Sequence, residues 1–227
     1  MTARLTAIAT IIALSTATAH AAEQLVEVDS FSGVSIGSGM KTKVTCGSSN
    51  TITLRGKQKE LNKIDVAIDQ DILDISRNVS AGSIIGKLLS SGDTENTQVE
   101  LDIEMTDGML SLIDISSGAT IKVDSCAVNS SKVIVDASSG SYVEVNGFTT
   151  DLELDMSTGS AFNRSATSFT VENAHVDLSS GATANLCGAT NIHGDAGSGA
   201  VIFAGKEVNT ADLDLSFGAD TSSKRCK

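Results

Sequence analysis

The most regular feature of the chain is an alternation of apolar and polar residues around a Ser-Ser-Gly motif. The segment 113–119 reads Ile-Asp-Ile-Ser-Ser-Gly-Ala, and related segments follow at 135–141, 154–160, 176–182, 194–200 and 213–219. Their glycines are separated by 22, 19, 22, 18 and 19 residues. A repeat with a period near 20 residues is typical of solenoid proteins, in which each unit stacks on the next.

Each copy of the motif predicts a strand, a tight turn and a second strand. Counting from the repeat glycine, positions −5 and −3 are apolar in nearly every copy and position −4 is always aspartate, as in Ile113, Ile115 and Asp114. Because successive side chains of a strand point to opposite faces, the aspartate faces away from the apolar pair. Glycine suits the turn because it adopts positive φ without steric cost. Positions +1 and +3 are again mostly small or apolar, as in Ala119 and Ile121, so the apolar face continues.

The length of the repeat indicates how these strands pack. A unit of about 20 residues cannot bury its own apolar face, whereas units stacked about 4.8 Å apart bury a continuous apolar column. We therefore predict an all-β fold, a right-handed parallel β-helix or β-solenoid with rungs of about 20 residues. The alternative is an antiparallel sandwich, which also contains short alternating strands. The recurrence of one residue type at one turn position favours stacked rungs.

The segment 22–110 is less regular and is predicted to add irregular rungs and an N-terminal cap before the regular repeats of 111–221. Six stretches are predicted as strands: 34–36, 43–45, 51–54, 64–68, 72–75 and 99–105. The segment 81–97 interrupts them and is expected to form a projecting loop or a short helix. The basic tail from Ser222 is expected to cap the far end, because the open ends of a solenoid need covering.

The first 21 residues predict a signal peptide. A short basic start precedes an uncharged apolar run over 5–18, and Ala19-His20-Ala21 supplies a small-x-small cleavage pattern. The run is shorter than the roughly 20 residues that a membrane-spanning helix needs. We expect a single solenoid domain over 22–227 that is exported to the periplasm, the medium or the cell surface, with no membrane insertion.

The composition narrows the classes of partner. The 227 residues include no proline and no tryptophan, and the net charge is −12, from 16 Lys and Arg against 28 Asp and Glu. Nucleic-acid binding depends on clustered basic side chains, so this charge argues against a nucleic acid or an anionic membrane as the partner. Aromatic residues make up only 3% of the chain, which leaves few surfaces on which a sugar could stack.

Several segments resemble one known family. They are the opening 31–39 (Phe-Ser-Gly-Val-Ser-Ile-Gly-Ser-Gly), the strand 71–75 (Asp-Ile-Leu-Asp-Ile), the serial Ser-Ser-Gly repeats, and 203–206 (Phe-Ala-Gly-Lys). Together they are similar to the auto-transporter adhesin head domains of the GIN domain family, from Val26 to Ser223. The resemblance implies an exported β-helical protein that is labelled an adhesin, and it implies no catalytic residues. A shared fold is a weak guide to function.

A column of aspartates is the main candidate chemical feature. Six of them occupy position −4 of the repeats: Asp114, Asp136, Asp155, Asp177, Asp195 and Asp214. Stacking places neighbouring carboxylates about 5 Å apart, where like charges cost about 0.2–1 kcal/mol per pair. Two explanations are open. Either each aspartate caps its turn by accepting backbone N–H bonds, or divalent cations, most naturally calcium, bridge successive rungs.

Two histidines extend the metal hypothesis. His175 and His193 both occupy position −6, so they are expected on adjacent rungs and on the same outer face as the aspartates. With Asp155, Asp177 and Asp195 they form a candidate site for zinc or a similar ion. The alternative is a pair of exposed histidines beside acidic residues, without a metal.

Four cysteines in an exported protein allow three disulfide pairings: Cys46, Cys126, Cys187 and Cys226. In a solenoid, Cys126 and Cys187 lie three rungs apart, about 14 Å, which exceeds the roughly 7 Å between Cα atoms that a disulfide spans. A tail that folds back would join Cys226 to Cys187 and leave Cys46 with Cys126. Free buried thiols are the alternative.

Two classes of function remain. The first is a non-catalytic exported module that binds a surface polymer, a glycan or another protein, with no cofactor beyond the calcium or zinc considered above. The second is a polysaccharide-acting enzyme on the same scaffold, which needs two convergent carboxylates in a groove. No pair of carboxylates in the sequence is set apart in this way, so the binding module is preferred.

Overall fold

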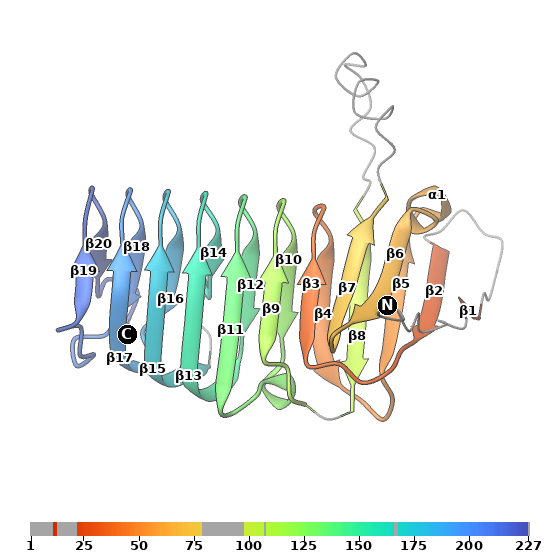
Figure 1. The fold of residues 1–227 in the computed structure, drawn as a ribbon, viewed down its shortest axis with the longest axis horizontal. Helices are drawn as coiled ribbons and strands as arrows, with labels where there is room; N and C mark the ends of the chain where they lie inside the picture. The colour runs from red at the N-terminus through yellow and green to blue at the C-terminus, as the bar shows by residue number, and fades with distance from the viewer. Residues whose placement is uncertain (1–10, 13–21, 79–97, 107, 166–167, 227) are drawn as a thin grey trace, which may run out of the picture.

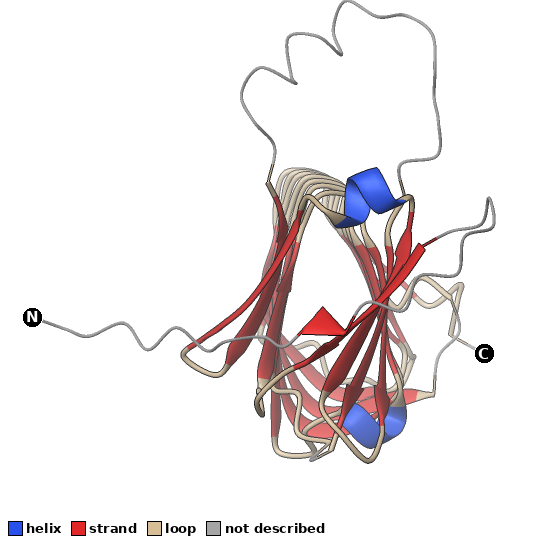
Figure 2. Cartoon of the chain, turned by 90° about the vertical axis from the view of Figure 1, so that its right-hand side faces the viewer, coloured by secondary structure: helices blue, strands red, loops and turns tan. Residues whose placement is uncertain are grey.

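The computed structural model describes residues 11–12, 22–78, 98–106, 108–165 and 168–226. Over these residues the chain forms two facing β-sheets joined by stacked turns, with the strands of successive repeats parallel and in register (Figure 1). The predicted all-β solenoid is therefore confirmed. Viewed along the long axis, the two sheets enclose the core between them (Figure 2).

The spatial order of the strands differs from their order in the sequence. Within the described residues, the eleven-stranded sheet runs β1 (Ile11–Ile12), β2 (Ala22–Glu27), β5 (Thr51–Gly56), β8 (Glu100–Met105), β4 (Lys41–Cys46), β10 (Thr120–Val123), β12 (Tyr142–Val145), β14 (Ala161–Phe162), β16 (Thr183–Leu186), β18 (Val201–Ala204) and β20 (Asp220–Ser222). The nine-stranded sheet runs β19 (Leu213–Leu215), β17 (Ala189–Ala196), β15 (Phe169–Leu178), β13 (Gly147–Met156), β11 (Lys132–Ala137), β9 (Leu112–Ile115), β3 (Gly33–Ile36), β7 (Ile72–Arg77) and β6 (Ile64–Asp69).

Two short helices accompany these strands in the described part of the chain. They are α1 (Gln58–Leu61), between β5 and β6, and the 3-10 helix η1 (Ser125–Ala127), after β10. At four and three residues, neither approaches the length of a membrane-spanning helix.

Each Ser-Ser-Gly motif forms a tight turn from a strand of the nine-stranded sheet into one of the eleven-stranded sheet. In the first repeat the amide of Ala119 donates to the carbonyl of Ser116 at 3.1 Å. Both central residues have positive φ, 55° at Ser117 and 73° at Gly118. Positive φ at both positions defines a type I′ turn. The residue before the glycine thus shares the left-handed conformation expected for the glycine alone.

In-register stacking builds the core from columns of like positions. At position −3 the buried column contains Ile115, Ala137, Met156, Leu178 and Ala196, none more than 1% exposed. At position +3 the facing sheet contributes Ile121, Val143, Phe162, Ala184 and Ile202, all at 0% exposure. Large and small residues follow one another within a column, as with Phe162 beside Ala184, so the space between the sheets is filled.

The rungs of the N-terminal half do not follow the order of the sequence. β3 lies between β7 and β9, and β4 lies between β8 and β10, all parallel. The chain forms the β3–β4 rung, moves outward through β5 and β6, and then adds the β7–β8 rung on the outer side. Antiparallel β2, β5 and β6 complete this end. The six predicted strands are all present, while the predicted loop 81–97 lies outside the described residues.

Two disulfides join distant parts of the chain. Cys46, at the end of β4, is bonded to Cys126 in η1, with Cα atoms 6.0 Å apart. Cys187, after β16, is bonded to Cys226 in the C-terminal tail, with Cα atoms 5.2 Å apart. No cysteine of the described residues is free, so the alternative of buried thiols does not hold. The rung spacing excluded the bond between Cys126 and Cys187, and the observed pairing is the one expected from a tail that folds back.

The C-terminal tail does not cap the solenoid, and the prediction that it does is wrong. Its disulfide holds it beside Cys187, and the guanidinium of Arg225 lies over the ring of Phe203 in β18, 4.5 Å from the centroid. Arg225 also donates to the carbonyl of Arg164, at 3.2 Å. These contacts lead the tail back along the eleven-stranded sheet. The edge strands β19 and β20 are therefore left as the end of the solenoid (Figure 1).

Candidate functional site

The candidate site lies on the outer face of the nine-stranded sheet. There the six repeat aspartates are Cα partners from strand to strand, and all are exposed; we call them the aspartate row: Asp114, Asp136, Asp155, Asp177, Asp195 and Asp214. Parallel register places one carboxylate on each rung, at the strand spacing of about 4.8 Å.

The aspartate row continues past the first repeat to a residue that was not predicted to belong to it. Ser35 of β3 is the partner of Asp114 on one side and of Asp74 in β7 on the other. The hydroxyl of Ser35 donates to Oδ2 of Asp114 at 3.3 Å. The segment around Asp74 carries the same apolar–aspartate–apolar pattern as the repeats, but no Ser-Ser-Gly turn follows it. From this pattern the sequence could have predicted that Asp74 lies in line with the aspartate row.

The aspartates do not cap the turns, so this explanation of the row is wrong. The turn amides donate to backbone carbonyls instead: Gly118 to Ser139 at 3.0 Å, and Ala119 to Ser116 at 3.1 Å. Among the described residues, the one side-chain hydrogen bond to the aspartate row comes from Ser35. No lysine or arginine of the described residues forms an ion pair with the row. The carboxylates are thus stacked without compensating charge.

The electrostatics of the row follow from this stacking. Partial burial raises the pKa of Asp136, and the neighbouring Asp114 raises it further. Partial burial also raises the pKa of Asp155, with added contributions from Asp136, Asp177 and Glu153. These two carboxylates are harder to ionise because burial and like-charged neighbours both disfavour the charged form. A cation placed against the row would relieve this repulsion.

A second row lies two residues before the aspartates on the same strands. Its members Glu153, His175 and His193 are Cα partners on β13, β15 and β17, and all are exposed. The two imidazole rings lie 5.0 Å apart between centroids, tilted by 39°. The ion pair of Lys132 with Glu153, at 2.8 Å, lowers the pKa of Glu153. Lys132 therefore neutralises a carboxylate of the second row and not one of the aspartate row.

The structure brings the predicted metal ligands onto one face but not around one point. His175 and His193 lie side by side, and Asp155, Asp177 and Asp195 run parallel to them on the same strands. Within the described residues, no group of three or more His, Cys, Asp or Glu side chains is arranged to hold a metal ion. Cation binding here would need side chains to rearrange or a ligand to complete the coordination.

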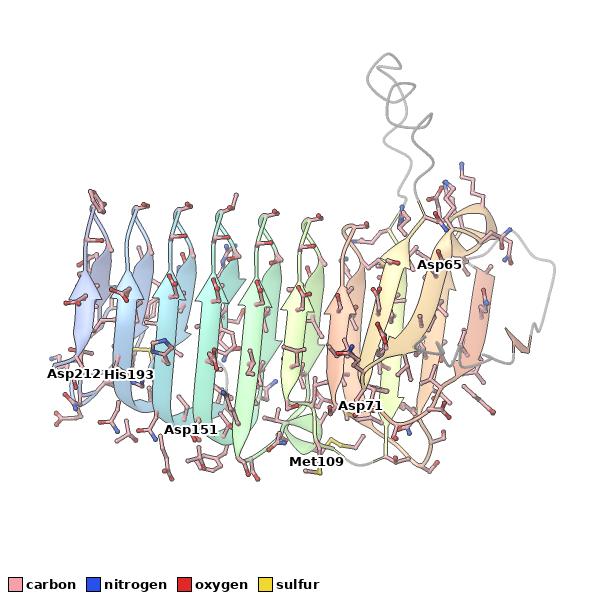
Figure 3. All side chains as sticks on the ribbon, in the orientation of Figure 1. Asp65, Asp71, Met109, Asp151, His193 and Asp212 are labelled. Atoms are coloured by element: carbon pink, nitrogen blue, oxygen red, sulfur yellow. A yellow bond between two sulfur atoms is a disulfide. The ribbon has the colours of Figure 1, made fainter. Side chains whose placement is uncertain are left out.

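A third row consists of side chains that are hydrogen-bonded to one another. Nδ2 of Asn173 donates to Asp151 at 3.2 Å, Nδ2 of Asn191 donates to Asn173 at 3.1 Å, and Nδ2 of Asn209 donates to Asn191 at 3.2 Å. We call these four residues the asparagine ladder. It was not predicted from the sequence, although its first three members all lie eight residues before a repeat glycine. Figure 3 labels Asp151 at one end of the ladder and His193 in the row above it.

The three rows make this face a periodic polar surface. The ladder holds its side chains in one direction, since Asn173 and Asn191 each accept from one neighbour and donate to the other. The rows repeat at the rung spacing of about 4.8 Å, which suits contact with an extended partner at several points. Neighbouring carboxylates within a row lie side by side on adjacent strands of one sheet, rather than opposite each other on the two sheets.

The family of the chain follows from a match to its sequence. The profile described as "putative auto-transporter adhesin, head GIN domain" matches residues 30–206. The chain belongs to this family. No curated protein matches the chain. The matched range begins between β2 and β3 and ends just after β18.

One solved structure supports this fold. A putative adhesin from Bacteroides fragilis NCTC 9343 is 12% identical with a TM-score of 0.58, covering 90% of this chain and 98% of the other. A putative adhesin from Parabacteroides distasonis ATCC 8503 is 9% identical with a TM-score of 0.47, covering 89% and 96%. A putative lipid binding protein from the same strain is 7% identical with a TM-score of 0.45, covering 90% and 96%. At these identities the first likeness supports the fold alone, and the other two carry no argument.

Proposed function

We propose that this GIN-domain protein is an exported, non-catalytic binding module that adheres through the outer face of its nine-stranded sheet. The observation that carries the proposal is the aspartate row, whose carboxylates are stacked rung by rung without a basic partner among the described residues. The ligand is an extended surface polymer, glycan or protein. It is held either by its own cationic groups or by divalent cations, calcium or zinc, that lie between the row and an anionic polymer.

Binding of a cation removes repulsion between the carboxylates of the aspartate row. Each carboxylate of the row lies beside others of the same charge, and this adds to the effect of burial in raising the pKa of Asp155 and Asp136. A cation that binds the folded protein alone increases its stability, by about 2.7 kcal/mol at 100 times the dissociation constant. Because several rungs contribute at once, weak individual contacts add up along an extended ligand.

The raised pKa values do not require a catalytic acid. Partial burial and the neighbouring carboxylates account for them. A polysaccharide-acting enzyme needs an acid and a second carboxylate on either side of one scissile bond. The row instead offers the same carboxylate once per rung, which suits binding along a chain.

The test is thermal unfolding of the purified protein in EDTA, calcium chloride or zinc chloride. We expect a cation to raise the Tm, and the triple variant Asp155→Asn, Asp177→Asn and Asp195→Asn to lose most of that rise. A matched control replaces three exposed carboxylates outside the row: Glu27→Gln, Asp69→Asn and Glu207→Gln. The control should keep the rise. An equal rise in both variants would move cation binding away from the row.

Ligand binding is tested with two probes of opposite charge. Immobilised poly-lysine tests a cationic ligand, and immobilised alginate with and without calcium tests a cation bridge. We expect one of them to retain the wild-type protein and the control variant but not the triple variant. Failure of both probes, or retention of the triple variant, would contradict adhesion through this face.

A further inference from the structure

The C-terminal end of the solenoid leaves both sheets without a partner strand in the described part of the chain. β19 pairs with β17 on one side only, and β20 pairs with β18 on one side only. Such edges present unpaired N–H and C=O groups that can pair with another chain. The opposite end differs, because antiparallel β2, β5 and β6 extend the two sheets there in place of a further parallel rung. The two ends are therefore not equivalent.

The apolar core continues into this open end without being covered. Leu213 and Leu215 are the partners of Gly194 and Ala196, so they prolong two columns of the nine-stranded sheet. Leu215 is 44% exposed, whereas Ala196 on the previous rung is 1% exposed. No strand of the described residues pairs with β19 on its outer side. A further rung in that position would bury Leu215.

Phe217 is the most exposed large apolar side chain of the described residues, at 88%. It occupies the first left-handed position of the last turn, with φ of 47°. The six equivalent positions hold small hydroxyl residues: Ser38, Ser117, Ser139, Thr158, Ser180 and Ser198. A bulky residue with positive φ is conformationally unfavourable. At this exposure Phe217 gains little from burial within its own chain to offset that cost.

The tail that could cover the end is held away from it. The disulfide to Cys187 and the stacking of Arg225 on Phe203 hold the tail along the eleven-stranded sheet. Without the tail, the end is acidic, since residues 206–222 contain one basic and four acidic side chains. Two such ends therefore repel each other, and strand pairing between them has to outweigh that repulsion.

We propose that two copies of this chain associate tail to tail through β19 and β20. A single peptide strand can complete one sheet edge, whereas a second copy of the same end completes both edges at once. A two-fold axis along the strand direction sets β19 against β20 of the second copy in antiparallel pairing. It also brings the two Phe217 side chains to the same edge of the joint. Pairing of this kind closes after two copies, as expected for an isologous interface.

The experiment compares the mass of the protein in solution over a range of concentrations, by light scattering after size exclusion or by sedimentation. The test variant is Phe217→Ser, which restores the residue type of the equivalent turns and should keep the fold. The control is Phe148→Ser, which removes an exposed phenylalanine of β13 away from the end. We expect a dimer for the wild type and the control, and at least a roughly tenfold weaker dimer for Phe217→Ser. Circular dichroism and the Tm verify that both variants are folded.

Three results would overturn this proposal. A wild-type protein that stays monomeric at all concentrations has no such interface. Growth beyond the dimer indicates head-to-tail stacking of the two different ends. A Phe217→Ser variant that dimerises as well as the wild type places the contact elsewhere, and so does a loss of dimer in Phe148→Ser.

Discussion

The side chain of Asn191 donates a hydrogen bond to the side chain of Asn173, 3.1 Å away on the preceding rung. The same side chain accepts from Asn209 and also donates to the carbonyl of Glu172. It therefore joins three successive rungs along the outer face of the nine-stranded sheet. Its contribution can be measured directly.

We expect Asn191→Ala to lower the free energy of unfolding by about 1–2 kcal/mol. The substitution removes the hydrogen bonds that the Asn191 side chain forms with Asn173 and Asn209. Urea unfolding followed by circular dichroism gives this value. The control is Thr190→Ala, an exposed neighbour on the same strand that lies outside the ladder and should change stability by less than about 0.5 kcal/mol. Equal losses in both variants would show that the ladder contributes nothing specific.

The raised pKa values of Asp136 and Asp155 predict a pH dependence of stability. An acid whose pKa is higher in the folded than in the unfolded state stabilises the fold when it is protonated. This contribution is complete below the ordinary value of 3.8 and is lost as the pH rises through the folded pKa. The double variant Asp136→Asn and Asp155→Asn should therefore be more stable than the wild type at neutral pH.

The stability gain of this double variant should shrink as the pH is lowered toward 3.8, and the urea midpoint at several pH values measures it. Glu60 and Glu153 have lowered pKa values, so their contributions to stability change with pH in the opposite direction. Burial opposes ionisation of Glu60, but Lys63 and Arg77 outweigh it and lower its pKa, and Lys132 lowers the pKa of Glu153. Both proteins retain these glutamates, so comparison at each pH cancels their effect. A gain that does not change with pH would contradict repulsion within the row.

Two glycines with positive φ should differ sharply in their tolerance of alanine. At Gly194, φ is 114° and a Cβ would collide with the backbone carbonyl of Val176 on the neighbouring strand. At Gly140, in a turn, φ is 74° and a Cβ would meet nothing within 4 Å. Gly140→Ala should cost about 1–2 kcal/mol from backbone conformation alone.

Gly194→Ala should cost clearly more than Gly140→Ala, because it adds the displacement of β15 to the conformational cost. Chemical unfolding of the two variants side by side measures the difference. If Gly194→Ala is no more destabilising than Gly140→Ala, the close approach of β17 to Val176 is relieved by a small shift of the strands.

Local periodicity was sufficient to predict the regular half of the protein. Strand, turn and strand recur at a constant distance from each repeat glycine, and the in-register stacking of Asp114 with Asp136 follows from that constancy. The pairing of His175 with His193 follows in the same way. The turn-cap role of the aspartates was predicted wrongly, because turn sequences do not show that the backbone amides already pair with carbonyls of the same turn and of the next rung.

The sequence alone therefore determined the repeat, the alternation of buried and exposed positions and the rows that they generate, since each depends on neighbours within about 20 residues. The tertiary structure decided which rungs touch. It placed β7 and β8 outside the earlier β3 and β4, joined Asp74 to the aspartate row, and led the tail away from the open end. These outcomes depend on contacts between residues far apart in the chain, and the burial of apolar surface selects among them only when the whole solenoid is assembled.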